Sequence, residues 1–349
     1  MEVKVTFICF LFLKLLMRGH CFDQQEGLIP KFGIKKLFVF GDSYADTGNV
    51  IQMFREKPYG ITYPGKPAGR YSNGHILTDY LAQYLGVKSP VPYRWRRYQK
   101  RHLHNGMNFA FGGAGVFQTV NLRPNLSSQI HYFERLIKQY SLYTQRDLED
   151  SLALVTLSGN DYSSYILNGG NIGEIFTKFI PKVVNELESC LRRISGLGIK
   201  RIAVGSVPPL GCLPVFTKLS GFQQCNSFVN LMSEHNVLLN GTLSKLNDEI
   251  IATEFAVINL QAAFNTILSN KGDPNAENLE LPTPLKPCCL PIGSFDCGDV
   301  DSNGTKMYTL CDKPESAFFW DKAHPTQAGW HAVFQLLKSA FQDIAEFGH

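Results

Sequence analysis

Short apolar runs alternate along this chain with longer segments that carry apolar residues at helical spacing. Residues 37–40, Leu-Phe-Val-Phe, are wholly apolar, which predicts a strand buried on both faces, as in parallel sheets. Four later apolar runs predict further strands, which begin near residues 107, 152, 201 and 255. Helical spacing predicts helices over residues 78–85, 128–145, 173–197, 226–251 and 325–341. Because strands and helices alternate without an internal repeat or a linker, the pattern predicts a single doubly wound α/β domain over residues 33–349.

A glycine turn follows the first predicted strand. Gly41 ends the apolar run, and Asp42 and Ser43 stand where a helix over residues 44–54 is expected to begin. Open α/β sheets bind ligands at the carboxyl ends of their strands. A helix N-terminus there offers free N–H groups and a positive dipole end, which suit a developing oxyanion. Ser43 is therefore a candidate nucleophile, with the alternative that Asp42 and Ser43 only cap a helix.

Two further strand ends carry candidate oxyanion donors. The apolar run after residue 107 ends in glycines that include Gly113, and glycines let a backbone approach a ligand closely. A tight turn with no ligand explains these glycines equally well. The strand after residue 152 ends in Ser-Gly-Asn-Asp, which places the Asn160 amide on the same edge. Together with the backbone N–H of Ser43, these groups form a candidate oxyanion hole.

Asp321 and His324 stand on a predicted loop just before the last helix. Three residues apart, the carboxylate could hold one imidazole nitrogen and leave the other free as a base. Asp, His and Pro are also common at helix starts, which is the alternative for this segment. The chain has no Gly-x-Ser-x-Gly sequence, which argues against an ordinary α/β-hydrolase nucleophile turn.

The N-terminal segment and the charge restrict the class of protein. Residues 1–21 combine a Lys4 n-region, an apolar stretch and small residues before a cut at Phe22, which predicts a secretory signal peptide. The formal net charge of +4 over 349 residues is too small for a nucleic-acid footprint. The sequence therefore predicts a secreted, extracellular protein with no transmembrane segment and no nucleic-acid partner. Three glycosylation sequons agree with secretion, at Asn125, Asn240 and Asn303.

Seven cysteines remain after the predicted signal peptide. Cys190 lies in a helical pattern, which predicts a buried free thiol. The other six lie in loop-like sequence, which predicts three disulfides whose pairing the sequence leaves open. Four of them fall in residues 270–314, a long loop that disulfides would constrain. Zinc is the competing interpretation, but the chain has no paired Cys-x-x-Cys, so no metal site is predicted.

A basic stretch interrupts the first half of the chain. Residues 94–104 hold five Lys or Arg and two His, with Tyr93, Trp95 and Tyr98 interleaved. A solvated surface segment is the plain interpretation. The more specific alternative is a patch for an acidic polysaccharide or an anionic lipid.

Four sequence blocks together make the chain similar to the plant-type GDSL, or SGNH, esterase/lipase family. They are Phe-Gly-Asp-Ser-Tyr-Ala-Asp-Thr-Gly-Asn at 40–49, Asn-Phe-Ala-Phe-Gly-Gly-Ala at 108–114, Ser-Gly-Asn-Asp at 158–161 and Trp-Asp-Lys-Ala-His-Pro-Thr at 320–326. Residues 208–214, Pro-Pro-Leu-Gly-Cys-Leu-Pro, also resemble a stretch typical of the plant branch. The resemblance implies a flavodoxin-like three-layer α/β/α sandwich with a five-stranded parallel sheet.

The resemblance also implies roles for the candidate residues. Ser43 is the nucleophile, His324 the general base and Asp321 the residue that orients the imidazole. The N–H groups of Ser43 and Gly113 and the Asn160 amide form the oxyanion hole. One position departs from the family pattern, because Tyr44 replaces the usual leucine after the serine. We expect residue 44 to pack behind the nucleophile and to change the shape of the pocket.

The resulting prediction is a serine esterase or lipase that cleaves a small-molecule or lipid ester through an acyl-enzyme, with no cofactor. An acyltransferase that uses the same serine and a catalytically inactive secreted glycoprotein are the alternatives. A metal-dependent phosphoesterase would need Asp-x-His and Gly-His-x-His ligand sets, which the chain lacks. The remaining histidines, including His75, His131, His235 and His331, are expected to be surface or packing residues. The natural ester, its acyl chain length and the oligomeric state stay open at this point.

Overall fold

The computed structural model describes residues 31–54, 56–269 and 283–348. Its centre is a parallel sheet whose strand order is β2-β3-β1-β4-β5-β6. The strands are β1 (Lys36–Gly41), β2 (Val91–Pro92), β3 (Gly106–Asn108), β4 (Ser151–Thr156), β5 (Arg201–Gly205) and β6 (Glu254–Ile258). The predicted signal peptide at residues 1–21 lies outside the described residues.

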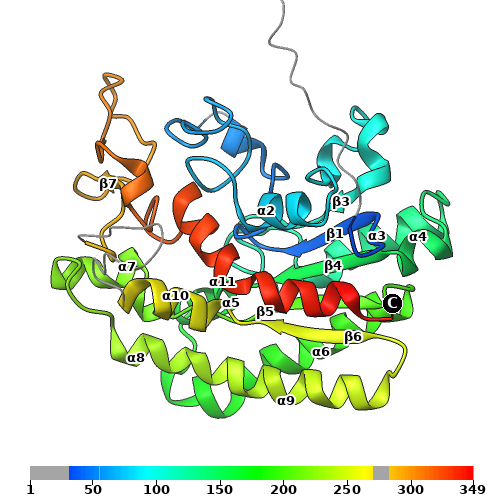
Figure 1. Cartoon of the computed structure of the whole chain (residues 1–349). Coiled ribbons are helices and arrows are strands. Elements are labelled where there is room, and N and C mark those ends of the chain that lie inside the picture. Colours follow the sequence, from blue (N-terminus) through cyan, green and yellow to red (C-terminus); the bar gives the residue numbers. More distant parts are fainter. Residues whose placement is uncertain (1–30, 55, 270–282, 349) are drawn as a thin grey trace, which may run out of the picture.

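Helices cover both faces of this sheet, as Figure 1 shows. One layer contains α2 (Leu77–Tyr84), α10 (Leu260–Ser269) and α11 (Gln327–Glu346), which contact one another or the strands β5 and β6. The other layer contains α3 (Leu126–Lys138), α6 (Ile180–Gly196) and α9 (Glu234–Glu249), which contact β1, β6 and one another. The predicted three-layer α/β/α class is therefore confirmed. The sheet has six strands where five were expected, because the two-residue β2 adds an edge.

Burial on both faces explains why the central strands are apolar without alternation. All six residues of β1 and all six of β4 are buried, because helices pack on both faces of the sheet. Gly41 ends β1 at a place where a side chain does not fit. A β-carbon there would lie 1.9 Å from the carbonyl oxygen of Thr156 on the neighbouring strand.

Five predicted helices differ from the structure. The one predicted over residues 128–145 ends at Lys138 in α3, and the one over residues 173–197 consists of a 3₁₀ segment (Ile172–Glu174), a π segment (Ile175–Phe179) and α6. Residues 44–54 form turns and a short 3₁₀ segment, η1 (Ile51–Phe54). Residues 226–251 are divided into α8 (Ser227–Asn230), a 3₁₀ segment and α9. At the end of α8, the Asn230 side chain accepts a hydrogen bond from the N–H of Gly211 at 2.8 Å. Helix α11 begins at Gln327, after an N-cap by the hydroxyl of Thr326, so Pro325 precedes the helix.

The long tract before the last helix has some structure of its own. In the described residues it contains an antiparallel pair of strands, β7 (Cys289–Pro291) and β8 (Tyr308–Leu310). The remaining short helices are α4 (Gln145–Glu149), α5 (Asn160–Leu167) and α7 (Pro214–Thr217), and the 3₁₀ segments include η2 (Tyr93–Trp95) and η3 (Lys100–Asn105). Within the described residues, no helix is long and apolar enough to cross a membrane.

All six cysteines expected in disulfides are paired, and Cys190 is a free, buried thiol. The pairs are Cys212–Cys225, Cys288–Cys311 and Cys289–Cys297. The prediction of three disulfides and one buried thiol is confirmed, and the structure supplies the pairing that the sequence left open. The Cys190 thiol is inert in this setting, because burial raises its pKa to about 12.

Candidate active site

Ser43, His324 and Asp321 lie in contact, in series, at the carboxyl edge of the sheet. The Ser43 hydroxyl oxygen is 2.8 Å from Nε2 of His324. On the other side of the ring, Nδ1 of His324 is 2.8 Å from both carboxylate oxygens of Asp321. The structure thus brings together residues that are 281 positions apart in the sequence. This arrangement lets the imidazole accept a proton from the hydroxyl while the carboxylate holds the ring.

Asp321 is buried and fully hydrogen-bonded. Its Oδ1 accepts from the N–H of Ala323 at 2.8 Å and from the N–H of His324 at 2.9 Å. Its Oδ2 accepts from the Tyr59 hydroxyl at 2.7 Å. Burial alone raises the pKa of Asp321, but the His324 ring, the Ala323 N–H and the Tyr59 hydroxyl together hold it below its usual value. The carboxylate is therefore charged and its orientation is fixed.

The segment after Ser43 is a turn built around the buried Asp46, so the predicted helix over residues 44–54 is wrong. The Asp46 carboxylate accepts from the N–H groups of Gly48 and Asn49, both at 2.7 Å, and of Gly112 at 2.9 Å. In a helix over residues 44–54, the N–H groups of Gly48 and Asn49 would instead have bonded to carbonyls one turn earlier. Burial raises the pKa of Asp46 to about 6, and the three N–H groups oppose that rise. No helix dipole therefore acts on Ser43 from this segment.

Asp42 connects the Ser43 turn to the turn at residues 158–160. Its Oδ2 accepts from the N–H and the hydroxyl of Ser158, at 2.5 and 2.6 Å, and from the Asn160 amide at 3.0 Å. Its Oδ1 accepts from the N–H of Tyr44 at 3.1 Å. Burial raises the pKa of the Asp42 carboxyl, and the bonds from Ser158 and Tyr44 offset only part of that rise. Asp42 thus fixes the position of Ser43 relative to Asn160, which is more than an N-cap would do.

The three expected oxyanion donors line one cavity, but they are not equivalent. Among the described residues, no acceptor bonds the backbone N–H of Ser43 or of Gly113. The Asn160 amide, in contrast, donates to Asp42 and also to the carbonyl of Ala114, both at 3.0 Å. Gly113 has φ +83°, a left-handed conformation that favours glycine. Among the residues that line the cavity, Ser43 and Gly113 therefore each have an N–H without a bonded acceptor in the described part of the chain, whereas both N–H groups of the Asn160 amide are already bonded.

Comparison with known proteins gives the family. Residues 37–337 match the GDSL-like lipase/acylhydrolase family. The chain belongs to this family. A GDSL esterase/lipase of Arabidopsis thaliana is 45% identical over 97% of this chain and 97% of its own length. A second one from the same plant is 41% identical over 98% of each chain. The resemblance expected from the four sequence blocks is confirmed.

A solved structure with a much lower similarity was also found. The crystal structure of LAE5, an alpha/beta hydrolase enzyme from the metagenome of Lake Arreo in Spain, aligns with 89% of this chain and 96% of its own. The TM-score is 0.43 and the sequence identity 11%.

Tyr44, the departure from the GDSL pattern, joins the nucleophile turn to the histidine loop. Its ring is buried and packs edge-on against Trp330, with ring centres 5.0 Å apart. Its hydroxyl donates to the carbonyl of Ala323 at 2.9 Å. Ala323 lies between Asp321 and His324, so this bond connects the peptide next to Ser43 with the loop that carries the base. The expected packing of residue 44 is present, and the hydroxyl adds a contact that leucine cannot make.

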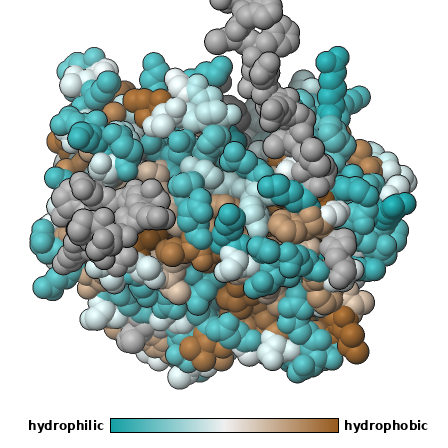
Figure 2. Space-filling model, viewed as in Figure 1, coloured by the Kyte–Doolittle hydropathy of each residue, from teal (hydrophilic) through white to brown (hydrophobic). Residues whose placement is uncertain are grey.

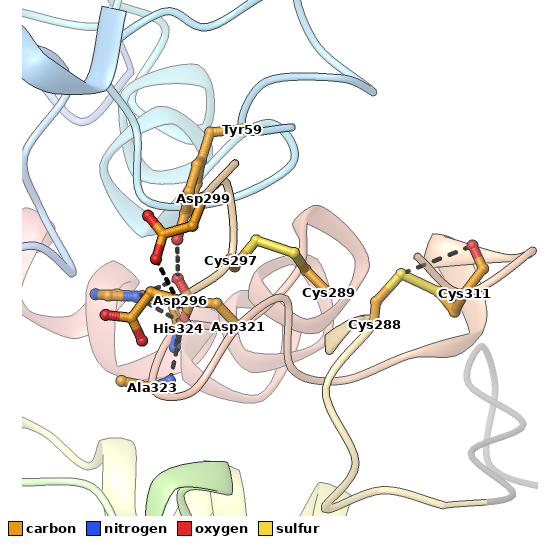
Figure 3. Close-up of a disulfide and its surroundings, with 10 residues drawn as sticks. All are labelled: Tyr59, Cys288, Cys289, Asp296, Cys297, Asp299, Cys311, Asp321, Ala323 and His324. Atoms are coloured by element: carbon orange, nitrogen blue, oxygen red, sulfur yellow. Dashed lines mark hydrogen bonds and ion pairs between the residues drawn. A yellow bond between two sulfur atoms is a disulfide. The ribbon is translucent and has the colours of Figure 1, made fainter. Parts of the chain in front are cut away.

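Tyr59 was not among the residues predicted from the sequence. It comes from a loop 262 positions before Asp321, and no motif marks it. Figure 3 shows Tyr59 pointing at Asp321, with the Cys289–Cys297 disulfide beside them. The disulfide supports the same loop, because the N–H of Cys289 donates to the carbonyl of Trp320 at 2.7 Å. The cysteine tract is therefore part of the scaffold of the site.

The GDSL site opens into a cavity of about 540 Å³. Ser43, Gly113, Asn160 and His324 line one part of it. The wall beyond Asn160 is mainly apolar and is formed by Ile166, Leu210, Leu213, Val215, Phe216, Phe228, Val229 and Met232. Such a wall suits a hydrocarbon chain next to the reacting groups.

The other candidate residues lie elsewhere. Asn240 and Asn303 are exposed, and Asn125 caps α3 by accepting from the N–H of Ser128 at 3.0 Å. His235 is buried, and its Nδ1 is 2.6 Å from the Tyr162 hydroxyl. The histidines that were expected to be surface or packing residues do not line the cavity; they are His75, His131, His235 and His331. Within the described residues, no group of three or more His, Cys, Asp or Glu side chains is placed to hold a metal ion.

Proposed function

We propose that this protein is a serine esterase or lipase that hydrolyses carboxylic esters through an acyl-enzyme. The observation that carries the proposal is the contact series from the Ser43 hydroxyl through His324 to Asp321, with 2.8 Å at each step. Membership of the GDSL-like lipase/acylhydrolase family and the names of the Arabidopsis relatives agree with it.

In the first step, Nε2 of His324 takes the proton of the Ser43 hydroxyl as its oxygen attacks the ester carbonyl. The charge of Asp321 stabilises the imidazolium that forms. The imidazolium then gives its proton to the departing alkoxide, which leaves an ester of Ser43. In the second step, His324 takes a proton from water as the water oxygen attacks the acyl-enzyme carbonyl. The imidazolium then gives this proton to the Ser43 oxygen as the bond between that oxygen and the acyl carbon breaks, which releases the acid and restores the free enzyme. Atoms balance with water as the co-substrate, and the residues named supply the chemistry without a cofactor.

Negative charge on the tetrahedral intermediate needs donors that are aimed at it. The N–H groups of Ser43 and Gly113 are available for this role, because neither is bonded to another described residue and both residues line the cavity. The Asn160 amide becomes a third donor when one of its N–H bonds turns from the carbonyl of Ala114 to the oxyanion. Asp42 keeps the other N–H bond throughout and so holds the amide in place.

We further propose that the acyl chain lies along the apolar wall of the cavity, from Leu210 to Phe228, and that the alcohol part faces the opposite, polar side. We also propose that the protein is secreted as one domain after removal of residues 1–21 and carries glycans at Asn125, Asn240 and Asn303. Three disulfides support an oxidising, extracellular location.

The test is hydrolysis of p-nitrophenyl esters of graded chain length by the wild type and by Ser43→Ala. We expect activity that the variant loses by at least about 10³-fold, because the nucleophile is removed. Ser163→Ala is the matched control, since Ser163 lines the same cavity and its hydroxyl donates to the carbonyl of Asn160 at 3.1 Å, its one side-chain bond within the described residues. Equal rates in the wild type and Ser43→Ala would refute the mechanism.

A further inference from the structure

A second cavity, of about 610 Å³, lies at the opposite end of the sheet from Ser43. It lies between the segment that contains η3, the C-terminal end of α3, the start of β1 and α4. Lys36, the first residue of β1, lines it, whereas Ser43 follows the last residue of that strand. A strand of this length puts the two cavities about 20 Å apart. The cavity is therefore separate from the candidate active site.

One side of this cavity is strongly basic. Lys36, Arg96, Arg97, Lys100 and His104 line it, and the single acidic residue among its lining residues is Asp147. These basic residues include four from the stretch at 94–104 that the GDSL site does not use. Figure 2 shows hydrophilic side chains on the upper right of the molecule, where Figure 1 places this cyan stretch.

The cations differ in how far they are already neutralised. Lys36 forms an ion pair with Asp147 at 2.8 Å, so these two charges cancel. Arg96 lies over the ring of Tyr93, 3.8 Å from its centre. Arg97 and Lys100 are exposed, and neither side chain has an ion pair or a hydrogen bond with another described residue. The cavity therefore presents cations that are free to bind an anion.

The other side of the cavity is apolar and well fixed. Leu136 and Tyr143 are buried, while Leu103 and Leu142 are partly buried and line the same space. The Tyr143 hydroxyl donates to the carbonyl of Leu103 at 3.1 Å, which ties η3 to the body of the protein. An apolar wall beside free cations distinguishes this cavity from a stretch of solvated charges.

We propose that this cavity binds an amphiphilic anion: a carboxylate or phosphate head paired with Arg97 and Lys100, and a hydrocarbon tail against Leu103, Leu136 and Leu142. Arginine matches the planar geometry of both head groups. The volume lies within the range of small-molecule sites, about 300–1,000 Å³. An acidic polysaccharide fits less well, because its fully polar chain would leave the leucine wall unused.

The test is calorimetric titration of the intact protein with dodecanoate below its micelle concentration. We expect the double variant Arg97→Gln/Lys100→Gln to bind at least about tenfold more weakly than the wild type, because charge-assisted hydrogen bonds are lost. The matched control is Lys286→Gln/Lys313→Gln, which removes the same charge from exposed lysines away from the cavity. We expect this control to bind as the wild type does. Any dodecanoate bound in the Ser43 cavity contributes equally to all three proteins.

Two further arms test the tail and the source of the ligand. Acetate has the same head and no tail, so we expect it to bind at least about tenfold more weakly than dodecanoate, since several buried methylenes are missing. Sedimentation with phosphatidylglycerol vesicles, with phosphatidylcholine vesicles as the control, identifies the source. Vesicle binding that the Arg97/Lys100 variant loses assigns a lipid head group, whereas dodecanoate binding without vesicle binding assigns a free amphiphile.

Either source supports the proposal. Three results would overturn it: no binding of dodecanoate, equal affinity in the wild type and the Arg97/Lys100 variant, or equal affinity for acetate and dodecanoate. Both substituted positions are exposed, so we expect unchanged melting temperatures. Leu103→Ser supplies a second variant, and it should weaken the binding of dodecanoate while leaving that of acetate unchanged.

Discussion

The hydroxyl of Tyr44 provides a sharp test of how the nucleophile turn and the histidine loop are held together. Tyr44→Phe removes one oxygen atom and keeps the ring that packs against Trp330 and Phe264. The Ala323 carbonyl then loses the bond that it accepts at 2.9 Å. Because Tyr44 is only 1% exposed, its hydroxyl lies in a largely buried setting, and the Ala323 carbonyl that it bonds is half-buried.

The expected magnitude follows from that burial. A hydrogen bond contributes about 0.5–1.5 kcal/mol net, and a buried partner left unpaired costs about 1–3 kcal/mol. We therefore expect the free energy of unfolding to fall by about 1–3 kcal/mol. If about 1 kcal/mol of this is lost in the transition state, kcat falls about fivefold. KM should change little, because the substituted atom faces the Ala323 carbonyl and not the apolar wall of the cavity.

The assay is steady-state hydrolysis of a p-nitrophenyl ester together with chemical denaturation. The matched control is Tyr80→Phe, which removes a hydroxyl that donates to the carbonyl of Gln327 at 3.1 Å, outside the Asp321–His324 loop. We expect it to lose stability without losing kcat. If Tyr44→Phe keeps the wild-type kcat, or if Tyr80→Phe lowers kcat as much, the positioning role of Tyr44 is refuted.

Three other predictions follow from the surroundings of the site. Tyr59→Phe should lower the free energy of unfolding at pH 7 by about 1.5–3 kcal/mol, because the charged Asp321 loses a buried hydrogen bond. Chemical denaturation measures this change. An unchanged free energy of unfolding would contradict the hydrogen bond between Tyr59 and Asp321. Replacing Cys289 and Cys297 by serine should lower the free energy of unfolding by about 2–3 kcal/mol, the value expected for a disulfide with a sequence separation of 8. The replacement should also lower kcat, because the disulfide supports the loop that carries Asp321. An unchanged kcat would show that the disulfide does not position Asp321. Burial lowers the pKa of His235 to about 4, so the unfolded chain binds its proton more readily and stability is lost as pH falls from 6.5 to 4. Over that pH interval the free energy of unfolding of the wild type should fall by about 3 kcal/mol more than that of His235→Gln. Equal decreases in the two proteins would show that His235 is not the group responsible.

Much of the site could be predicted because its parts are local. Each candidate residue stands directly after a buried strand or before the last helix, and parallel strands bring their carboxyl ends to one edge. Ser43, Gly113 and Asn160 therefore had to lie near one another once the strands were identified. Asp321 and His324 could be proposed from their spacing on the loop before the last helix, and the family resemblance assigned their roles as orienting residue and general base.

The features that were missed depend on distant partners. The turn after Ser43 follows from Asp46, whose buried carboxylate captures the N–H of Gly112, 66 positions away. Local propensity in residues 44–54 contains no sign of that partner. Tyr59 was overlooked for the same reason, since its contact with Asp321 exists only in the folded chain.

The break between α8 and α9 also lies beside distant partners. Asn230 accepts from the N–H of Gly211, next to the Cys212–Cys225 disulfide. Apolar spacing over residues 226–251 is compatible with one continuous helix, and it gives no sign of the tertiary contacts that lie beside the break. Sequence patterns therefore predicted the layers and the reacting groups, while the loops that position them required the structure.

Covalent labelling with a fluorophosphonate, followed by intact-mass and peptide analysis, tests the central claim most directly. Such a reagent bonds to a serine whose hydroxyl is activated by an adjacent base. We predict one label per chain, on Ser43, absent in Ser43→Ala and strongly slowed in His324→Gln. A wild-type protein that takes up no label, or that carries it on another serine, would contradict the assignment.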